Sequence, residues 1–272
     1  MMRALYTAAT GMIAEQTNVD TIANNLANVN TYGYKTESTE FKSLLYQTIQ
    51  TKTTSANGEN KPVGAQVGLG TRVAATTSMY TQGALTETGI ATDFAIEGKG
   101  FFAVRAVDGQ TYYTRDGSFT WSMTADGQTV LADSDGNPVL DSNGNQIAVP
   151  AGISAEKMKF SETGEIGYLD NDGNYVDLNQ TFGIYQFNNP AGLEKLSSSM
   201  LAATAASGQP ILEGTVAGLT PSKVHSGVLE GSNVQVADEM VNMIVAQRAY
   251  ELNSKAITTA DSMLDTANNL KR

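Results

Sequence analysis

A short glycine-rich pattern in this chain has the residue types of a nucleotide-binding turn. Gly98-Lys99-Gly100 precedes two phenylalanines, whereas a dinucleotide-binding turn must open a helix whose backbone N–H groups hold the pyrophosphate. The aromatic and β-branched residues that follow the glycines predict a strand instead. We therefore interpret the segment as a tight turn between two strands and expect no cofactor there.

Two acidic patterns place possible cation ligands at alternate positions. Residues 133–137 and 170–174 each carry Asp, Asp and Asn in this spacing, as the start of a calcium loop does. Neither pattern has the glycine at the sixth position or the glutamate at the twelfth that such a loop requires. We interpret both as hairpin turns and expect no bound metal.

Candidate catalytic residues are few. His225 is the only histidine, there is no cysteine, and no Gly-x-Ser-x-Gly sequence exposes a serine nucleophile. The 28 acidic residues offer many carboxylate pairs, but nothing in the sequence distinguishes one as the acid and base of a glycosidase. We therefore expect a protein that is not an enzyme.

The elements that organise the chain are two helices with apolar residues repeating every seven positions, one near each end. Such a repeat places an apolar stripe along a helix, and the stripe requires a partner helix. The N-terminal seam contains Leu5, Met12, Val19, Ile22, Leu26 and Val29, with Ala8 three positions after Leu5. The C-terminal seam contains Val236, Met243, Tyr250, Ile257 and Leu264, with Ala246, Ala260 and Ala267 interleaved. We predict that these residues pack the helices against each other and against other subunits.

The predicted helices cover residues 3–28 and 234–270. Asn and Gly residues at 28–33 are typical of a helix end. The sequence Ser232-Asn233-Val234-Gln235 fits a capping box for the second helix, whose first turn contains Asp238 and Glu239. Further along, Glu251 and Lys255 are spaced for an ion pair.

Asparagines lie beside the N-terminal seam at Asn24, Asn25 and Asn28. Asparagine lowers helix propensity because its amide competes for the backbone. A buried amide can, however, fix the register of packed helices. We favour this register role over the alternative, a frayed polar helix end.

The region between the helices has the pattern of β structure. Phe41, Leu44, Leu45 and Ile49 predict a short helical segment before an extended connection. After it, Asp-Gly or Asn-Gly pairs recur roughly every eight to ten residues, the spacing of consecutive hairpins. These pairs lie at 108–109, 116–117, 126–127, 135–136, 143–144 and 172–173.

The predicted fold class is α+β, with N- and C-terminal helices pairing as a coiled coil around a central, mainly β domain. The predicted division is an N-terminal helical segment 1–50, an extended connection 51–70, a β-rich domain 71–228 and a C-terminal helical segment 229–272. Two apolar seams separated by a β body are typical of a subunit that polymerises, because a two-helix hairpin leaves half of each seam exposed to water.

Composition supports this interpretation. Only 17% of the residues are charged, and the net charge of −11 falls mostly between the helices. No Lys/Arg cluster is present, so we expect no nucleic-acid partner. No segment approaches the roughly 18 apolar residues of a membrane helix, so we expect no membrane insertion. The apolar stretch near the N-terminus is diluted by Thr and Gly, and we expect it to remain uncleaved.

These residues resemble the axial rod and hook proteins of the bacterial flagellum. The resemblance covers nearly the whole chain, in the same order. It rests on Ala23–Asn28 with Gly33-Tyr34-Lys35, Gln82–Gly89, Phe94–Phe102, Tyr113–Phe119, Leu229–Val234 and Gln247–Glu251. Within that family the segments Met2–Met12 and Leu45–Gly70 are most similar to the distal rod member.

The resemblance implies a structural subunit that polymerises helically into the drive shaft linking motor to hook. The implied partners are other copies of itself, other rod proteins, hook protein and, where an outer membrane is present, the surrounding rings. It also implies type III export and a place in the basal body, spanning the periplasm. The alternatives are a proximal rod protein, a hook-type filament protein, or, with least support, an enzyme acting on peptidoglycan.

Overall fold

The computed structural model describes residues 2–50, 64–124, 127–150, 153–154, 157–170, 174–196, 199–215 and 218–270. The chain forms two compact units. Unit 1 contains residues 1–27, 37–78 and 235–272, and unit 2 contains residues 28–36 and 79–234. The predicted α+β class is confirmed, with one helix before and one after a mainly β region.

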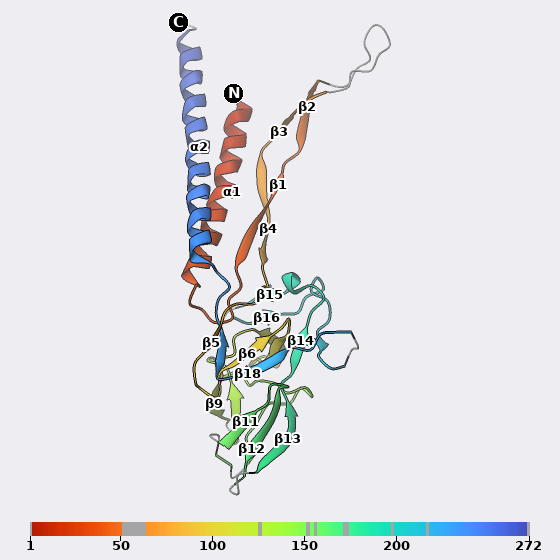
Figure 1. Ribbon diagram of the computed structural model, residues 1–272. Helices are drawn as coiled ribbons and strands as arrows, with labels where there is room; N and C mark the ends of the chain where they lie inside the picture. Colours follow the sequence, from red (N-terminus) through yellow and green to blue (C-terminus); the bar gives the residue numbers. More distant parts are fainter. Residues whose placement is uncertain are drawn as a thin grey trace, which may run out of the picture. The chain divides into compact units, whose positions relative to one another are not determined.

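Unit 1 consists of two helices and a long β-ribbon (Figure 1). Helix α1 spans Met2–Ala27 and helix α2 spans Val236–Asn269. At ~1.5 Å per residue, the 34 residues of α2 extend for about 50 Å. The ribbon pairs β1 (Glu37–Ser43) with β4 (Thr71–Ser78), and β2 (Tyr46–Gln50) with β3 (Ala65–Gly68), all antiparallel. Helix α1 lies between α2 and the ribbon and packs on both.

The ribbon corrects one prediction. The helical segment expected around Phe41 to Ile49 is wrong, because these residues form β1, β2 and the link between them. The neighbouring Thr, Ser and Tyr residues favour strands, and the apolar residues occur at helical spacing only by coincidence. Strand β4 belongs to this unit too. The expected extended connection lies largely outside the described residues, and the four-part domain division stays a prediction.

Unit 2 is built from short antiparallel strands. Its largest sheet has the order β15-β16-β8-β7-β14-β17, and a second sheet has the order β11-β12-β13. Strand pairs β9–β10, β18–β6 and β19–β5 complete the unit. The bounds are β5 Leu85–Glu87, β6 Phe94–Glu97, β7 Phe101–Arg105, β8 Thr111–Thr114, β9 Thr120–Met123, β10 Thr129–Ala132, β11 Met158–Phe160, β12 Glu165–Leu169, β13 Tyr175–Thr181, β14 Ile184–Gln186, β15 Glu194–Lys195, β16 Leu201–Ala202, β17 Ile211–Leu212, β18 Lys223–Ser226 and β19 Val228–Glu230, with a 3₁₀ turn η2 at Pro190–Gly192.

The core of unit 2 is aromatic and lies on both faces of β7. Phe102 points into the larger cluster with Phe94, Phe119 and Phe182, while Phe101 points into a smaller cluster. The two phenylalanines are fully buried because neighbouring strand residues face opposite sides of a sheet. The Gly98–Gly100 segment joins β6 to β7, which confirms the predicted strand–turn–strand.

The hairpin turns are confirmed at several of the predicted pairs. Gly109, Gly136 and Gly144 each have a positive φ, which glycine adopts without steric cost. Asp133 accepts hydrogen bonds from backbone and side-chain groups of its own turn, as the hairpin interpretation requires. The pair at 116–117 is not a hairpin, because the strands on either side of it do not pair with each other. The pair at 172–173 and Asp126 lie outside the described residues.

Candidate assembly surface and buried ion network

The closest packing between α1 and α2 involves small residues rather than the large members of the seams. Ala8 of α1 and Ala246 and Ala260 of α2 are almost fully buried. A Cβ atom added to Gly11 would lie 2.8 Å from the side chain of Asn253 on α2. Small side chains let the two backbones approach closely, and larger residues remain at the borders of the contact.

The predicted seam residues occupy those borders. Ile22 is buried at 5% exposure, whereas Val236 and Tyr250 are 43% and 41% exposed. Partly buried positions are occupied by Leu5, Met12, Val19, Leu26, Met243, Ile257 and Leu264, and by Val29 in unit 2. The helix pair alone therefore leaves most of these side chains partly in water. Their contact with other subunits stays a prediction.

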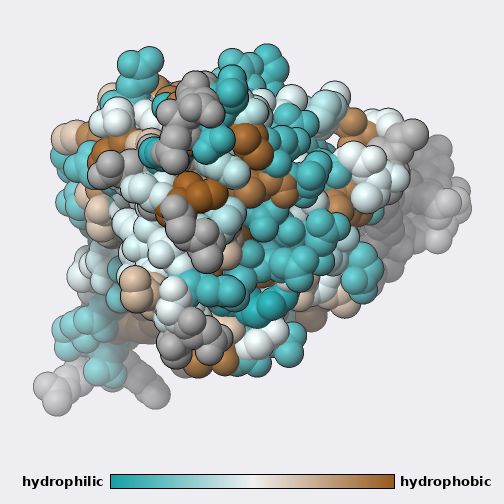
Figure 2. Space-filling model, turned by 90° about the horizontal axis from the view of Figure 1, so that it is seen from below, coloured by the Kyte–Doolittle hydropathy of each residue, from teal (hydrophilic) through white to brown (hydrophobic). Residues whose placement is uncertain are grey.

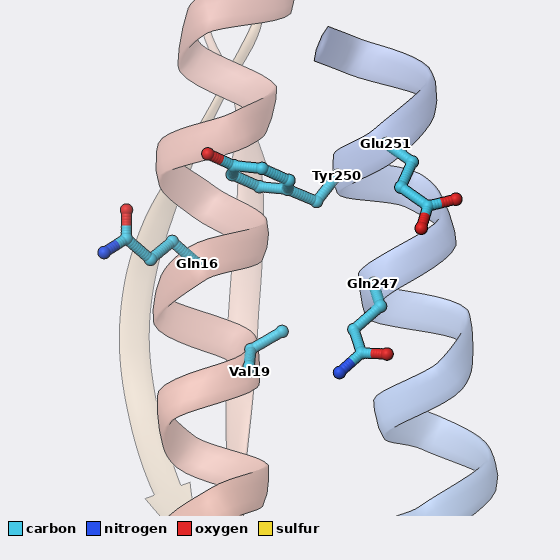
Figure 3. A pocket seen from close by; sticks show the side chains of 5 residues that line it. All are labelled: Gln16, Val19, Gln247, Tyr250 and Glu251. Carbon is cyan, nitrogen blue, oxygen red and sulfur yellow. The ribbon is translucent and has the colours of Figure 1, made fainter. Parts of the chain in front are cut away.

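A groove with both polar and apolar side chains runs between α1 and α2 (Figure 3). Its volume is about 360 Å³, and it is lined by Gln16 and Val19 of α1 and by Gln247, Tyr250 and Glu251 of α2. The ring of Tyr250 points across toward α1, while Gln16 points outward. Glu251 pairs with Arg248 at 3.0 Å, not with Lys255 as predicted. The groove is thus open and bordered by two predicted seam residues, Val19 and Tyr250.

Among the three asparagines, Asn25 occupies the interior. Its side-chain oxygen accepts the backbone N–H of Glu37 at 2.9 Å, and its amide nitrogen donates to the Glu37 carbonyl at 2.8 Å and to the Glu239 carboxylate at 3.1 Å. One side chain thereby joins α1, β1 and α2. Asn24 is exposed, and Asn28 lies in unit 2, where its oxygen accepts a hydrogen bond from Thr31.

The ribbon is held against α1 by close backbone approach. Gly70, with φ of +118°, lies so close to Thr10 that a Cβ atom there would overlap its hydroxyl. Farther along, the hydroxyls of Thr39 and Thr21 are 3.0 Å apart. A glycine at position 70 is therefore required both by the conformation and by the space available.

Helix α2 also exposes a second apolar face, directed away from α1. Six large residues on it are between 55% and 68% exposed. They are Met240, Val241, Ile244, Val245, Leu252 and Met263. By contrast, the molecular face seen in Figure 2 is mostly hydrophilic, and its hydrophobic residues lie in small separate groups. An exposed apolar strip of this extent marks an interaction surface.

The main polar site of unit 2 is a buried ion network around Glu230, which sequence analysis missed. Lys35 Nζ lies 2.6 Å from one carboxylate oxygen of Glu230, and Arg115 Nη1 lies 3.1 Å from the other. The backbone N–H of Gly83 donates to the same carboxylate at 2.9 Å. All three charged side chains are at most 3% exposed.

The two cations are held by backbone carbonyls as well. Lys35 donates to Thr81, and Arg115 donates to Ile96 and Gly98 and stacks on the Phe101 ring at 5.2 Å. Burial lowers the pKa of Lys35 and of Arg115, while the nearby Glu230 carboxylate acts in the opposite direction. Such a network is structural, because every charge is directed at another protein group.

Asn233 and Gly33 lie close in sequence to Glu230 and Lys35, and both contact other segments of unit 2. The Asn233 oxygen accepts the N–H and hydroxyl of Thr36 at 2.7 Å, and its amide donates to Met79 and Thr81. Gly33, with φ of +67°, packs against the backbone of Arg115. The capping box predicted at 232–235 is therefore wrong: α2 begins at Val236 with no side-chain cap, and Asn233 joins three segments of unit 2.

The residues considered for catalysis and metal binding can now be located in the fold. His225 on β18 lies 2.9 Å from the Glu97 carboxylate on β6, in an exposed pair. In the described part of the chain, no three His, Asp or Glu side chains gather as metal ligands would. Neither α1 nor α2, within the residues described, is apolar enough to cross a membrane.

Comparison with known proteins gives the family. Residues 5–35 match "Flagella basal body rod protein", residues 95–168 match "Flagellar hook protein FlgE/F/G D1 domain", and residues 225–270 match "Flagellar basal body rod FlgEFG protein C-terminal". These stretches contain α1, most of the residues around Glu230, and α2.

Several similar full-length proteins are named flagellar basal-body rod protein FlgG. The protein of Borreliella burgdorferi is 47% identical over 278 residues, which covers 100% of both chains. That of Agrobacterium fabrum is 43% identical over 99% of this chain and 100% of its own, and that of Buchnera aphidicola from Acyrthosiphon pisum is 39% identical over the same shares. The chain therefore belongs to the flagellar basal-body rod protein family.

Proposed function

We propose that this protein is a structural subunit of the distal rod of the bacterial flagellar basal body. It polymerises helically into the drive shaft that links the motor to the hook. The observation that carries the proposal is the uncovered apolar face of α2, found in a chain whose relatives are named as rod proteins. Five of its six residues lie in the first half of α2, where identical subunits could make repeated contacts.

The energetics of the helix pair support assembly. Burying a large aliphatic side chain is worth about 1.5–3 kcal/mol, and the pairing of α1 with α2 obtains only part of this from residues such as Met243, Ile257 and Leu264. Neighbouring copies that cover these residues and the outer face would supply the remainder. We propose that the helices are labile in the isolated chain and become ordered in the polymer.

The other assignments follow from the same role. We propose contacts with other rod proteins, with hook protein and, where the cell has an outer membrane, with the surrounding rings. We also propose that the rod spans the periplasm and that the chain is exported without cleavage. Helix α1 supports this, because its Ala8, Ala14 and Ile22 are buried in unit 1, as a structural helix requires.

A hook-type filament or proximal rod protein is the second candidate, since one matching region is described as hook protein D1 domain. The full-length relatives favour the rod. We propose no catalytic role: the titratable residues with the strongest mutual contacts, Lys35, Arg115 and Glu230, are buried and paired.

Electron microscopy of basal bodies, purified from cells with and without this protein, tests the assignment. We expect basal bodies without it to end before the distal part of the rod and to lack a hook. A complete, straight rod in its absence would contradict the proposal. A normal rod bearing a shortened hook would favour the hook-type alternative.

Amide hydrogen exchange tests the proposed lability of the helices. We expect fast exchange in residues 5–28 of the dilute monomer and strong protection in the polymer, because opening of a weakly packed helix pair is frequent. Strong protection of these residues in the monomer would show that the helix pair is complete without neighbours.

A further inference from the structure

Unit 1 carries two pairs of like charges whose members stand next to each other. On the ribbon, Lys42 of β1 faces Arg72 of β4 directly. On α2, Asp261 and Asp265 are exposed and four residues apart, so they occupy neighbouring positions on the helix surface. Like charges in either arrangement repel and destabilise the element that carries them.

Neither pair is neutralised by its own chain among the residues that the structure describes. Glu40, the nearest acid along β1, accepts a hydrogen bond from Thr77. No Lys or Arg stands three or four residues from Asp261 or Asp265. This contrasts with Glu251, which has Arg248 at that spacing and pairs with it.

The two pairs are opposite in charge and similar in spacing. Side chains opposed across an antiparallel ladder have Cβ atoms about 5 Å apart, and residues four apart on a helix have Cβ atoms about 5–6 Å apart. Two cations on the ribbon can therefore face two aspartates on α2 at the same time. Within one chain they do not meet, because α1 lies between α2 and the ribbon (Figure 1).

We infer that the β1–β4 ribbon of one copy docks on the flank of α2 in the next copy, with Lys42 and Arg72 against Asp261 and Asp265. Farther along α2, this flank is on the same side of the helix as Gln247, which lines the groove in Figure 3. Asp265 lies eighteen residues, or five helical turns, after Gln247, and so faces the same side. The inference rests on the proposed function and names the partner surfaces.

The layering of unit 1 makes this contact one between two different surfaces. In one copy the order is α2, α1, ribbon, so a ribbon that binds the next α2 repeats the same series from copy to copy. A contact between two different surfaces of identical subunits generates helical filaments when its rotation does not close. Charge complementarity then fixes the register and suppresses wrong neighbours.

Charge reversal tests the contact, with the critical concentration for assembly of the full chain measured by sedimentation. We expect K42E/R72E and D261K/D265K each to raise that concentration about tenfold, since attraction becomes repulsion at the contact. The quadruple variant, with both pairs reversed, is expected to return within about threefold of the original chain. E162K/E165K, an equal charge change on unit 2, is the control and leaves the concentration unchanged.

A mixture of the two double variants adds an independent measurement. Each double variant carries charges of one sign on both the ribbon and α2, so its copies repel one another. The ribbon of either variant, however, attracts α2 of the other variant. We expect the mixture to assemble at a concentration where neither variant does. The effect of the double variants should also shrink from about 0.1 M to 1 M salt, as the screening length falls from ~10 Å to ~3 Å. Circular dichroism confirms that every variant is folded.

The outcomes separate this inference from the proposed function. Assembly of the original chain with no recovery in the quadruple variant or the mixture would overturn the ribbon contact alone. Double variants that assemble like the original chain would do the same. Failure of the original chain to assemble under any condition would remove the proposed function, and the ribbon contact with it.

Discussion

The two units of this protein bury their residues in opposite ways. In unit 2, Phe94, Phe101 and Phe102 are 0% exposed, and the buried charges of Lys35, Arg115 and Glu230 are paired. In unit 1, the buried apolar residues of the two helices are alanines and Ile22, while Tyr250 and Val236 remain above 40% exposed. A folded protein normally places its largest apolar groups inside. Unit 2 follows that rule within one chain, and unit 1 follows it only if neighbours are present.

This difference separates the requirements of folding from those of assembly. A unit completed by its own aromatic core and ion network is stable as a monomer, so its surface can be polar. A helix pair that meets through alanines leaves apolar surface available for other copies, at a cost in its own stability. Substitutions in the two units are therefore expected to have different consequences.

The largest effect is expected for Glu230→Gln in unit 2. The amide removes the charge that Lys35 and Arg115 share and leaves two buried cations without an anion, which costs about 3–5 kcal/mol. Urea unfolding of the monomer, followed by fluorescence of Trp121 in β9, measures the loss. Glu97→Gln is the matched control, because Glu97 pairs with His225 at the surface, and we expect a far smaller change there, since an exposed ion pair contributes little. Equal losses in the two variants would refute the structural importance of the network.

Asn25→Ala is expected to have the next largest effect, now within unit 1. It leaves the N–H and carbonyl of Glu37 and the carboxylate of Glu239 without their shared partner, at about 1–3 kcal/mol. The helical signal of the monomer during thermal unfolding measures it. Asn24→Ala, one position along and exposed, is the control and changes the midpoint little. If both alanine variants unfolded alike, the register role of Asn25 would be lost.

The contrast between Asn25 and its neighbours shows which features of unit 1 could be predicted from the sequence and which could not. The heptads predicted both helices, and they included Ala8, Ala246 and Ala260 as members. They could not show that these alanines, rather than the large residues, would be buried. Close approach depends on the pair of helices, at contacts such as Gly11 with Asn253. The same holds for Asn25: three asparagines were candidates, and the positions of β1 and α2 select one.

The ion network was missed for a related reason. Lys35, Arg115 and Glu230 are 195 residues apart at most, and a charged residue in a turn-rich sequence is ordinarily at the surface. A signal was present: all three lie in the motifs Gly33-Tyr34-Lys35, Tyr113–Phe119 and Leu229–Val234, beside glycines. Gly33 and Gly83 permit close backbone contacts around the network. Only the fold shows that these motifs meet at one place.

A smaller effect in unit 2 is expected at alkaline pH. Burial, with a contribution from Tyr185, raises the pKa of Tyr113 to about 12. Above its ordinary pKa of 10, the unfolded chain loses the phenolic proton while the folded chain keeps it, so stability declines as the pH rises from about 10 toward 12. Below pH 10 this contribution is fully present. Tyr113→Phe removes the ionisable group and flattens the decline, measured as unfolding free energy against pH. An unchanged slope would assign the decline to other tyrosines.

The smallest effect on monomer stability, and the sharpest test of the comparison, is expected on the outer face of α2. Val241→Ser and Val245→Ser replace residues that are 59% and 62% exposed, so the unfolding free energy of the monomer should change by about 0.5 kcal/mol or less. In the polymer the same positions are proposed to be covered, and each serine then forfeits buried apolar area worth about 1–2 kcal/mol. We therefore expect normal monomers with a critical concentration for assembly raised at least fivefold.

Val104→Ser in the core of unit 2 is the converse control, because Val104 is 0% exposed and its loss destabilises the monomer first. Serine variants of α2 that assemble normally would place the subunit contacts elsewhere and leave the exposed face of α2 without a function.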